Sequence, residues 1–226
     1  MVEVFAHKLI DTHDFVGKKD EYLAMLPAKA KQRVLQYTRT EDLQRSLFGE
    51  LLVRRIVSGK LNIPPREIEI AFSSKGKPML QEKNDLHFNL SHSGHWVVCA
   101  IANKPVGVDV EMIQAGKLKI AKRFFTDTEI KDLRSKDDKK QLHYFFDLWT
   151  LKESYLKVLG KGLTLALNSF SVVNEENKFR IKIDTKFIDV HLKQYFIEEV
   201  YKLSVCAYED QFADKLVHVH TKDLLF

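Results

Sequence analysis

The sequence has little cysteine and no long apolar run. Its 226 residues include two cysteines, Cys99 and Cys206, far apart in the chain. They lack the spacing of a zinc site or a disulfide framework, and each lies in an apolar stretch that predicts a buried thiol in a strand. No stretch reaches the roughly 20 apolar residues that cross a bilayer, and the opening residues are too mixed for a signal sequence. We therefore expect a cytoplasmic protein without a membrane partner.

Long runs of a single charge are also missing. The formal net charge of +5 and the sequence pI of about 9.0 favour an acidic partner, such as a phosphorylated small molecule or an acidic protein. The lysine clusters are short, and Asp137 and Asp138 interrupt the one over residues 136–140. They are not interleaved with aromatic residues as in many nucleic-acid-binding proteins, so we do not expect a nucleic-acid partner.

The order of helical and strand patterns predicts an α+β protein. Helices are expected over residues 21–37, over 40–58 with Gly59 as C-cap, and over 138–159 ended by Gly160, and the pair Thr126 and Glu129 has the pattern of a capping box. Strands are expected over residues 1–10, 67–72, 87–90, 96–102, 106–111, 169–173, 187–192, 198–208 and 217–220. A turn at residues 103–105 lies near the midpoint, and we expect two halves, 1–104 and 105–226.

One strand motif brings two carboxylates together. In the segment Val106-Gly-Val-Asp-Val-Glu111, residues two apart share a face. The three valines are expected to face a core, with Asp109 and Glu111 side by side on the other face. Neighbouring carboxylates repel each other, and a magnesium ion, which takes one or two carboxylates with substrate phosphates, would compensate. An edge strand with a polar outer face is the alternative.

Three further motifs carry charged and polar groups. Trp149, Glu153 and Lys157 follow one another at i, i+4 and line one stripe of a helix, although a Glu–Lys pair at this spacing is commonly a surface pair. In residues 88–95, FNLSHSGH, a strand runs into a turn whose hydroxyls and backbone N–H groups suit a phosphate, or form an ordinary hairpin. Gly76-Lys77-Pro78 is a compact turn that displays a cation.

In this order and at these separations, the motifs resemble the surfactin-type family of 4′-phosphopantetheinyl transferases. The family hallmark, G-[I/V]-D-x-E followed by W-x-x-K-E-[S/A]-x-x-K, reads here as residues 107–111 and 149–157. The resemblance runs nearly end to end and includes the early helix with Arg45, the Arg123-Phe-Phe stretch and Gly160-Lys-Gly-Leu. It implies a monomer of two similar α+β halves related by a pseudo-twofold axis, with the active site between them.

The resemblance also implies an activity and its residues. The phosphopantetheine arm of coenzyme A would move to a serine of an apo acyl or peptidyl carrier protein, releasing 3′,5′-ADP. Asp109, Glu111 and Glu153 would bind Mg²⁺, and Glu153 could also accept the serine proton. Lys157 would neutralise the leaving phosphate or fix Glu153, and Lys152 would orient phosphate or pantetheine. Coenzyme A contacts are expected from cationic and hydroxyl side chains, namely Lys29, Lys31, Arg45, Ser46, Lys77, Ser91, His92 and Lys157.

Residues 113–125 are the expected carrier-binding segment. They mix apolar Leu118, Ile120 and Phe124 with four cations, Lys117, Lys119, Lys122 and Arg123. Carrier proteins of this kind are acidic around their serine, so the segment suits a docking surface with an apolar centre and a basic rim. An amphipathic segment that covers its own core is the alternative.

Two other functions stay open at this point. A different metal-dependent phosphate enzyme, such as a phosphodiesterase or a nucleotidyltransferase, would share the carboxylates and the ion but need no protein acceptor. A non-catalytic RNA-binding module would fit the high pI, but three carboxylates beside a phosphate site would repel RNA in the absence of a metal.

Overall fold

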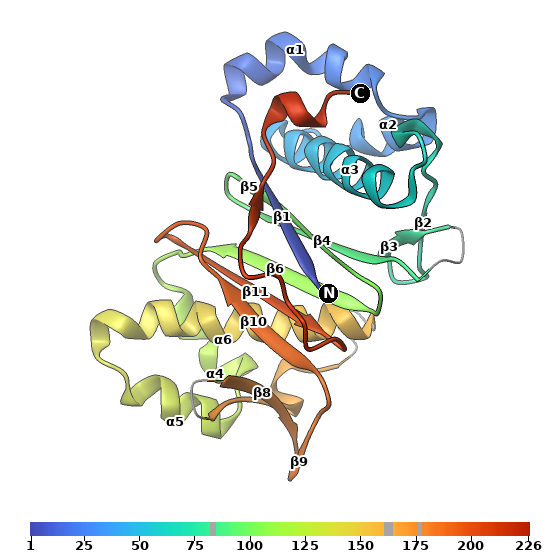
Figure 1. Cartoon of the computed structure of the whole chain (residues 1–226). Coiled ribbons are helices and arrows are strands. Elements are labelled where there is room, and N and C mark those ends of the chain that lie inside the picture. The colour runs from blue at the N-terminus through green and yellow to red at the C-terminus, as the bar shows by residue number, and fades with distance from the viewer. Residues whose placement is uncertain (82–84, 161–164, 176–177) are drawn as a thin grey trace.

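A computed structural model of the chain describes residues 1–81, 85–160, 165–175 and 178–226 (Figure 1). The first half runs through β1 (Glu3–Lys8), α1 (Thr12–Ala24), α2 (Ala28–Val34), α3 (Thr40–Leu61), β2 (Ile70–Phe72), β3 (Pro78–Leu80), β4 (His87–Ser93) and β5 (Trp96–Ala102). The rest runs through β6 (Val106–Met112), α4 (Ala121–Phe124), α5 (Asp127–Ser135), α6 (Asp138–Leu159), β7 (Ser171–Glu175), β8 (Lys178–Ile183), β9 (Lys186–Phe187), β10 (His191–Tyr195), β11 (Tyr201–Ala207) and β12 (Val217–His218).

The two halves have the same topology. In each, the first strand is followed by helices, a small antiparallel sheet and two further strands. The last of these strands pairs with the first and with its own predecessor, which gives the orders β1-β5-β4 and β6-β11-β10. A helix of 22 residues belongs to each half, α3 in the first and α6 in the second. The expected α+β class and the likeness of the halves are confirmed.

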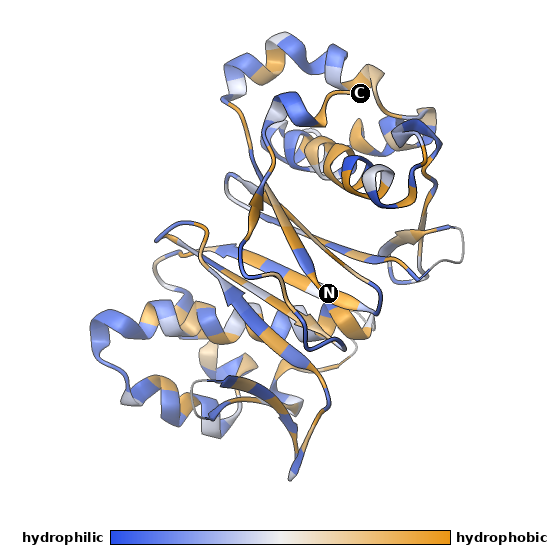
Figure 2. Cartoon of the chain, viewed as in Figure 1, coloured by the Kyte–Doolittle hydropathy of each residue, from blue (hydrophilic) through white to orange (hydrophobic). Residues whose placement is uncertain are grey.

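One of three hydrophobic clusters in the described residues lies between the two sheets. Val106, Val108 and Val110 are at most 1% exposed and pack there against residues of β1, β5 and β11, as their alternation predicted. The outer face of each sheet packs against the helices of its own half. Hydrophobic residues accordingly concentrate on the strands and α3, whereas α1 and α5 are mostly hydrophilic (Figure 2). Within the described ranges, no helix is both long and apolar enough to span a membrane.

A glycine lets α6 lie unusually close to β6. A Cβ atom at Gly107 would be 2.1 Å from the carbonyl oxygen of Ser154 and 2.5 Å from the amide nitrogen of Val158. Both are backbone atoms of α6 and cannot rotate away, so a larger residue at position 107 would displace the helix. The close approach brings the last turns of α6, including Glu153 and Lys157, over the acidic face of β6.

Several element boundaries differ from the sequence-based expectation. The predicted helix over residues 21–37 is wrong, because Pro27 separates α1 from α2. The helix α3 continues past Gly59 and ends where Asn62 takes a left-handed conformation, with φ of 55°. The predicted strand over residues 187–192 is split between β9 and β10.

Other expectations are confirmed at the residue level. The strand β5 and the helix α6 begin and end where they were predicted, and Gly160 caps α6 with φ of 64°. Thr126 and Glu129 form the expected capping box at α5. The residues Lys-Gly-Leu that follow Gly160 in the family motif lie outside the described residues.

The end of the chain returns to the first half. The strand β12 pairs in parallel with β1, and the carbonyl oxygen of Val219 contacts Nδ1 of His7 at 3.0 Å. Leu224 is fully buried in the core formed by α1, α2 and α3. Residues 217–224 thus contribute a strand and a core side chain to the first half, although they follow the second half in the sequence.

Candidate active site

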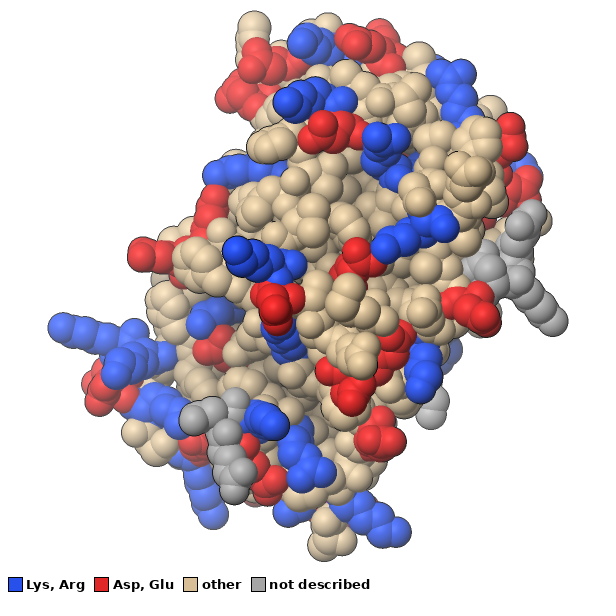
Figure 3. Space-filling view, in the orientation of Figure 1, with Lys and Arg blue, Asp and Glu red and all other residues tan. Residues whose placement is uncertain are grey.

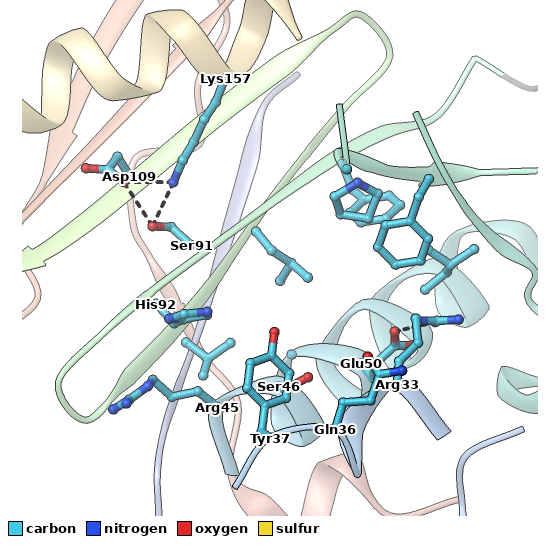
Figure 4. A pocket seen from close by; sticks show the side chains of 18 of the residues that line it. Arg33, Gln36, Tyr37, Arg45, Ser46, Glu50, Ser91, His92, Asp109 and Lys157 are labelled. Carbon is cyan, nitrogen blue, oxygen red and sulfur yellow. Dashed lines mark hydrogen bonds and ion pairs between the residues drawn. The ribbon is translucent and has the colours of Figure 1, made fainter. Parts of the chain in front are cut away.

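A cavity of about 750 Å³ lies between the two halves. This is within the usual range for small-molecule sites, about 300–1,000 Å³. Its polar lining includes Arg33, Gln36, Tyr37, Arg45, Ser46, Glu50, Ser91 and His92 from the first half, and Asp109, Glu111 and Lys157 from the second. Figure 4 shows Asp109 and Lys157 at one end of the cavity and Arg33 with Glu50 at the other. Most of the residues expected from the sequence are therefore brought together.

A hydrogen-bonded cluster forms the acidic end of the cavity. Nζ of Lys157 lies 2.7 Å from Oδ1 of Asp109 and also donates to the Ser91 hydroxyl and the Val108 carbonyl, each at 2.9 Å. The Ser91 hydroxyl donates to the same Asp109 oxygen at 3.0 Å (Figure 4). Ser91 belongs to β4, and its hydroxyl points to the carboxylate rather than lying in a turn as the sequence suggested.

The acidic face of β6 suits a divalent ion. Oδ2 of Asp109 is buried without a hydrogen-bond partner. Burial raises the pKa of both Asp109 and Glu111, and the charge of Asp109 raises that of Glu111 further. Among the described residues, no three His, Cys, Asp or Glu side chains are grouped closely enough to hold a metal ion by themselves. Magnesium commonly takes only one or two carboxylates and completes its shell with phosphates and water, so Asp109 and Glu111 fit the ion.

Glu153, the third expected Mg²⁺ ligand, lines an adjoining cavity of about 290 Å³ and not the cavity that Asp109 and Glu111 line, so its role in binding the ion stays a prediction. The two cavities share Leu90 and Lys157 in their linings. Burial, reinforced by the negative charges of Asp109 and Glu111, raises the pKa of Glu153 to about 7. A carboxylate with a pKa near neutrality is suited to accept a proton.

Lys77 joins the two halves at this adjoining cavity. Its Nζ donates a hydrogen bond to the main-chain carbonyl of Lys157, at the end of α6. Burial, and to a smaller extent the charge of Lys157, lower the pKa of Lys77 to about 8. Lys77 therefore lies beside Lys157 and lines the adjoining cavity, and its role in binding coenzyme A stays a prediction.

Arg45, Ser46 and His92 line the other side of the large cavity. The Arg45 guanidinium is held by the Gly94 carbonyl at 3.0 Å and the Asp42 carboxylate at 2.6 Å. His92 keeps an exposed edge but lies in the hollow, where desolvation and then the charges of Arg45 and Lys157 lower its pKa. Arg45 is the cation among these three residues, and a neutral His92 can donate a hydrogen bond, so this part of the cavity suits a phosphate.

Arg33, and neither Lys29 nor Lys31, lines the large cavity. Both lysines are exposed on α2. The Arg33 guanidinium lies 2.7 Å from a carboxylate oxygen of Glu50 and 4.7 Å from the ring of Phe72.

The expected role of Lys152 is wrong. Its side chain is fully buried, 2.6 Å from a carboxylate oxygen of Glu129 and 2.6 Å from the carbonyl oxygen of Phe170. Lys152 therefore ties α6 to α5 on the side of the helix away from the cavity. Adjacent residues of an α-helix point about 100° apart, so Lys152 and Glu153 face different surroundings.

The expected docking segment packs against the middle of α6, near Glu111. It forms a short 3-10 helix, Lys117–Ile120, followed by α4. Leu118, Ile120 and Phe124 are half-buried against the core of the second half, and Phe124 meets the Trp149 ring edge-on at 5.4 Å. Its four cations are exposed. The apolar side chains thus serve the fold and keep part of their surface available.

Comparisons with known proteins identify a family. Residues 18–104 match the model "4′-phosphopantetheinyl transferase, N-terminal", and residues 105–206 match "4′-phosphopantetheinyl transferase superfamily". A 4′-phosphopantetheinyl transferase of Bacillus subtilis is 37% identical over 210 residues, or 92% of this chain and 94% of the relative. The transferase gsp of Aneurinibacillus migulanus is 39% identical over 92% of this chain and 86% of its own.

A solved structure is a weaker match. The holo-(acyl-carrier-protein) synthase of Bacillus anthracis, in complex with CoA (3′,5′-ADP), covers 45% of this chain and 92% of its own, with 19% identity and a TM-score of 0.40. That likeness is too low to bear on the site. The sequence matches span both halves and include β6 and α6, which form the acidic end of the cavity. These matches show that the chain belongs to the 4′-phosphopantetheinyl transferase superfamily.

Proposed function

We propose that this protein transfers the 4′-phosphopantetheine arm of coenzyme A to a serine of an acyl or peptidyl carrier protein and releases 3′,5′-ADP. The observation that carries the proposal is the cavity between the halves, which has cationic walls and two carboxylates at one end. Family membership supports the same activity, since the relatives over nearly the whole chain are named 4′-phosphopantetheinyl transferases.

The cations of the cavity match the charges of coenzyme A. The substrate carries a pyrophosphate and a 3′-phosphate, and each needs positive partners when it leaves water. Lys157, at the acidic end, would contact the pyrophosphate. Arg33, Arg45 and His92 line the remaining walls and would contact the nucleotide.

Asp109 and Glu111 would hold Mg²⁺ beside the pyrophosphate. When bound, the ion would supply Lewis-acid neutralisation of the pyrophosphate charge. Lys157 lies against Asp109 in the structure and offers a second positive charge at the same place. As the bridging oxygen takes up negative charge, this ammonium group would stabilise it.

The transfer is a displacement at phosphorus. The hydroxyl oxygen of the carrier serine forms a bond to the phosphorus that bears pantetheine, and the bond from this phosphorus to the bridging oxygen breaks. The bridging oxygen leaves with 3′,5′-ADP and its electron pair. The serine proton would pass to Glu153, directly or through water, because burial raises the pKa of this carboxylate above its usual value.

Residues 113–125 would bind the carrier protein. Lys117 and Ile120 line a small cavity together with Glu111 and Trp149, so the segment adjoins the acidic end of the active site. The exposed cations of the segment suit the acidic surroundings of a carrier serine. A partner bound there would be next to the reacting groups.

A binding module for nucleic acid is less well supported. On the face shown in Figure 3, acidic and basic side chains are interspersed, whereas a nucleic-acid surface concentrates lysine and arginine. The three carboxylates near the cavity would also repel a polyanion. A monomer that works in the cytoplasm remains our prediction for the assembly and location of the enzyme.

The test is transfer to purified apo carrier proteins. The protein, coenzyme A and Mg²⁺ should add about 340 Da to a carrier, the mass of the phosphopantetheinyl group. Removing divalent ions, or the substitution Asp109→Ala, should abolish the mass increase. An unchanged carrier with hydrolysed coenzyme A would contradict the proposal and favour a phosphodiesterase.

A further inference from the structure

Side chains of β4 occupy the open edge of β6. One edge of β6 pairs with β11, and in an antiparallel pair every second residue directs its N–H away from the partner strand. The outward N–H groups of Val108, Val110 and Met112 donate to Asn89 Oδ1 at 2.8 Å, Ser91 Oγ at 3.2 Å and Ser93 Oγ at 3.0 Å, respectively. We call Asn89, Ser91 and Ser93 the β4 ladder.

The same serines reach the carboxylates of β6. Ser91 donates its hydroxyl proton to Asp109 Oδ1, and Ser93 donates to Glu111 Oε2 at 2.8 Å. A serine hydroxyl has one proton and two lone pairs, so each can accept from the backbone and donate to a carboxylate at once. The β4 ladder thus fixes the register of the two halves and the direction of both carboxylates together.

The two carboxylates are held unequally. Asp109 is 4% exposed and also has Lys157 at 2.7 Å, so it keeps a partner if Ser91 is lost. Glu111 is only half-buried, and among the residues that the structure describes its carboxylate accepts a hydrogen bond from Ser93. A change at Ser93 should therefore free Glu111 more than a change at Ser91 frees Asp109.

We infer that Ser93 is a positioning residue that orients Glu111 toward a divalent ion. The inference rests on the proposed function. The hydroxyl would hold Glu111 Oε2 and leave the other carboxylate oxygen for the ion. Partners of metal ligands typically change metal affinity or activity by about 10- to 100-fold when removed.

The test compares Ser93→Ala and Ser93→Thr with the unmodified protein. Mn²⁺ binding in the presence of coenzyme A is measured by electron paramagnetic resonance, and the Mg²⁺ requirement is measured in the transfer assay. We expect Ser93→Ala to weaken Mn²⁺ binding about 10-fold and raise the required Mg²⁺ similarly. Ser93→Thr keeps the hydroxyl and should retain most of the affinity. Ser135→Ala is the matched control, because that hydroxyl bonds Asp132 of α5.

The outcomes separate the inference from the proposed function. If the unmodified protein neither binds Mn²⁺ nor needs a divalent ion, the metal role of the acidic pair fails. If the unmodified protein binds Mn²⁺ and Ser93→Ala binds it equally well, Ser93 is not a positioning residue. An equal loss in both Ser93 variants would also overturn the inference, because the hydroxyl would then not be the group that matters.

Discussion

The two halves of the molecule share a topology but place different charges at the cavity. The first half contributes the guanidinium groups of Arg33 and Arg45 with one carboxylate, Glu50, and the second contributes the carboxylates of Asp109 and Glu111 with one ammonium group, Lys157. In each half the first strand turns one face toward the other sheet and one toward its own helices. In β1 this second face includes Phe5 and the buried His7, which packs on Phe48 of α3. In β6 the corresponding face carries the carboxylates. Under the proposed function, a repeated scaffold would supply a nucleotide side and a metal side to one site.

The largest expected effect concerns the catalytic carboxylate of the second half. Glu153→Gln removes the proposed base and should lower kcat by at least about 100-fold. In the unmodified enzyme, kcat/KM should rise with pH and level off by about 7, because Glu153 must lose its proton to act; its pKa is about 7 in the metal-free site, and bound Mg²⁺ would lower it by offsetting the charges of Asp109 and Glu111. A pH–rate profile measures both effects. If kcat/KM of Glu153→Gln rises with pH in the same way, the ionisation belongs to another group.

This substitution should also change stability. The folded pKa of about 7 exceeds the value of 4.5 for a free glutamate, so the folded state binds the proton more tightly than the unfolded state. The stability of the enzyme therefore falls as pH rises from about 4.5 to 7. At pH 8, Glu153→Gln should be more stable by on the order of 1 kcal/mol, a value reduced for partial exposure. Urea unfolding at pH 5 and 8 measures this difference.

The next effect contrasts the helix packing of the two halves. Gly107→Ala should destabilise the fold by about 2–3 kcal/mol and impair transfer, because the new Cβ meets the backbone of α6. Gly49 of α3 is the matched position, since a Cβ there would be 3.8 Å from side-chain atoms of Leu90 and Val97. Gly49→Ala should be neutral or stabilise by up to about 1 kcal/mol. Equal urea midpoints for the two variants would contradict this contrast.

A smaller effect tests the cations of the first half. Arg33→Ala should raise KM for coenzyme A about 10-fold, because a charged hydrogen-bond donor is lost from the cavity wall. Lys29→Ala and Lys31→Ala should leave KM within about twofold, since both side chains are exposed and outside the lining. Initial rates at varied coenzyme A measure all three. A larger effect of either lysine than of Arg33 would reverse our assignment.

The smallest effect tests the carrier-binding segment. Leu118→Asp should raise KM for the carrier about fivefold and leave the affinity for coenzyme A unchanged, because it places a negative charge opposite an acidic partner. Val16→Asp is the control, since Val16 is 57% exposed on α1. If both affinities fall together in Leu118→Asp, the segment has only a structural role.

Local patterns predicted much of the fold, and the errors have local causes. The period-two alternation over residues 106–111 was sufficient to predict β6, because one face of this strand packs in the core between the sheets and the other face carries the carboxylates. The predicted helix over residues 21–37 was wrong because the apolar periodicity was given more weight than the helix-breaking Pro27. Arg33, which follows Pro27 on α2, was therefore not recognised as a cavity residue. Gly59 was predicted to cap α3, but the helix continues through this residue and ends at Asn62.

Side-chain partners were less predictable than elements. Lys152 and Glu153 are adjacent in a motif, but tertiary packing sends Lys152 into a buried ion pair with Glu129. The β4 ladder depends on the edge of one sheet meeting the edge of another, a long-range contact that residue spacing does not report. For the same reason the sequence linked Ser91 to a phosphate and not to Asp109.

The return of residues 217–224 to the first half has a consequence for biosynthesis. A ribosome completes residues 1–104 well before it makes β12 and Leu224, so the nascent first half lacks one edge strand and one interior side chain. Its sheet edge at β1 stays open during that interval, and open edges invite pairing with other chains. Synthesis of the second half therefore has to finish before the earlier half is protected from aggregation.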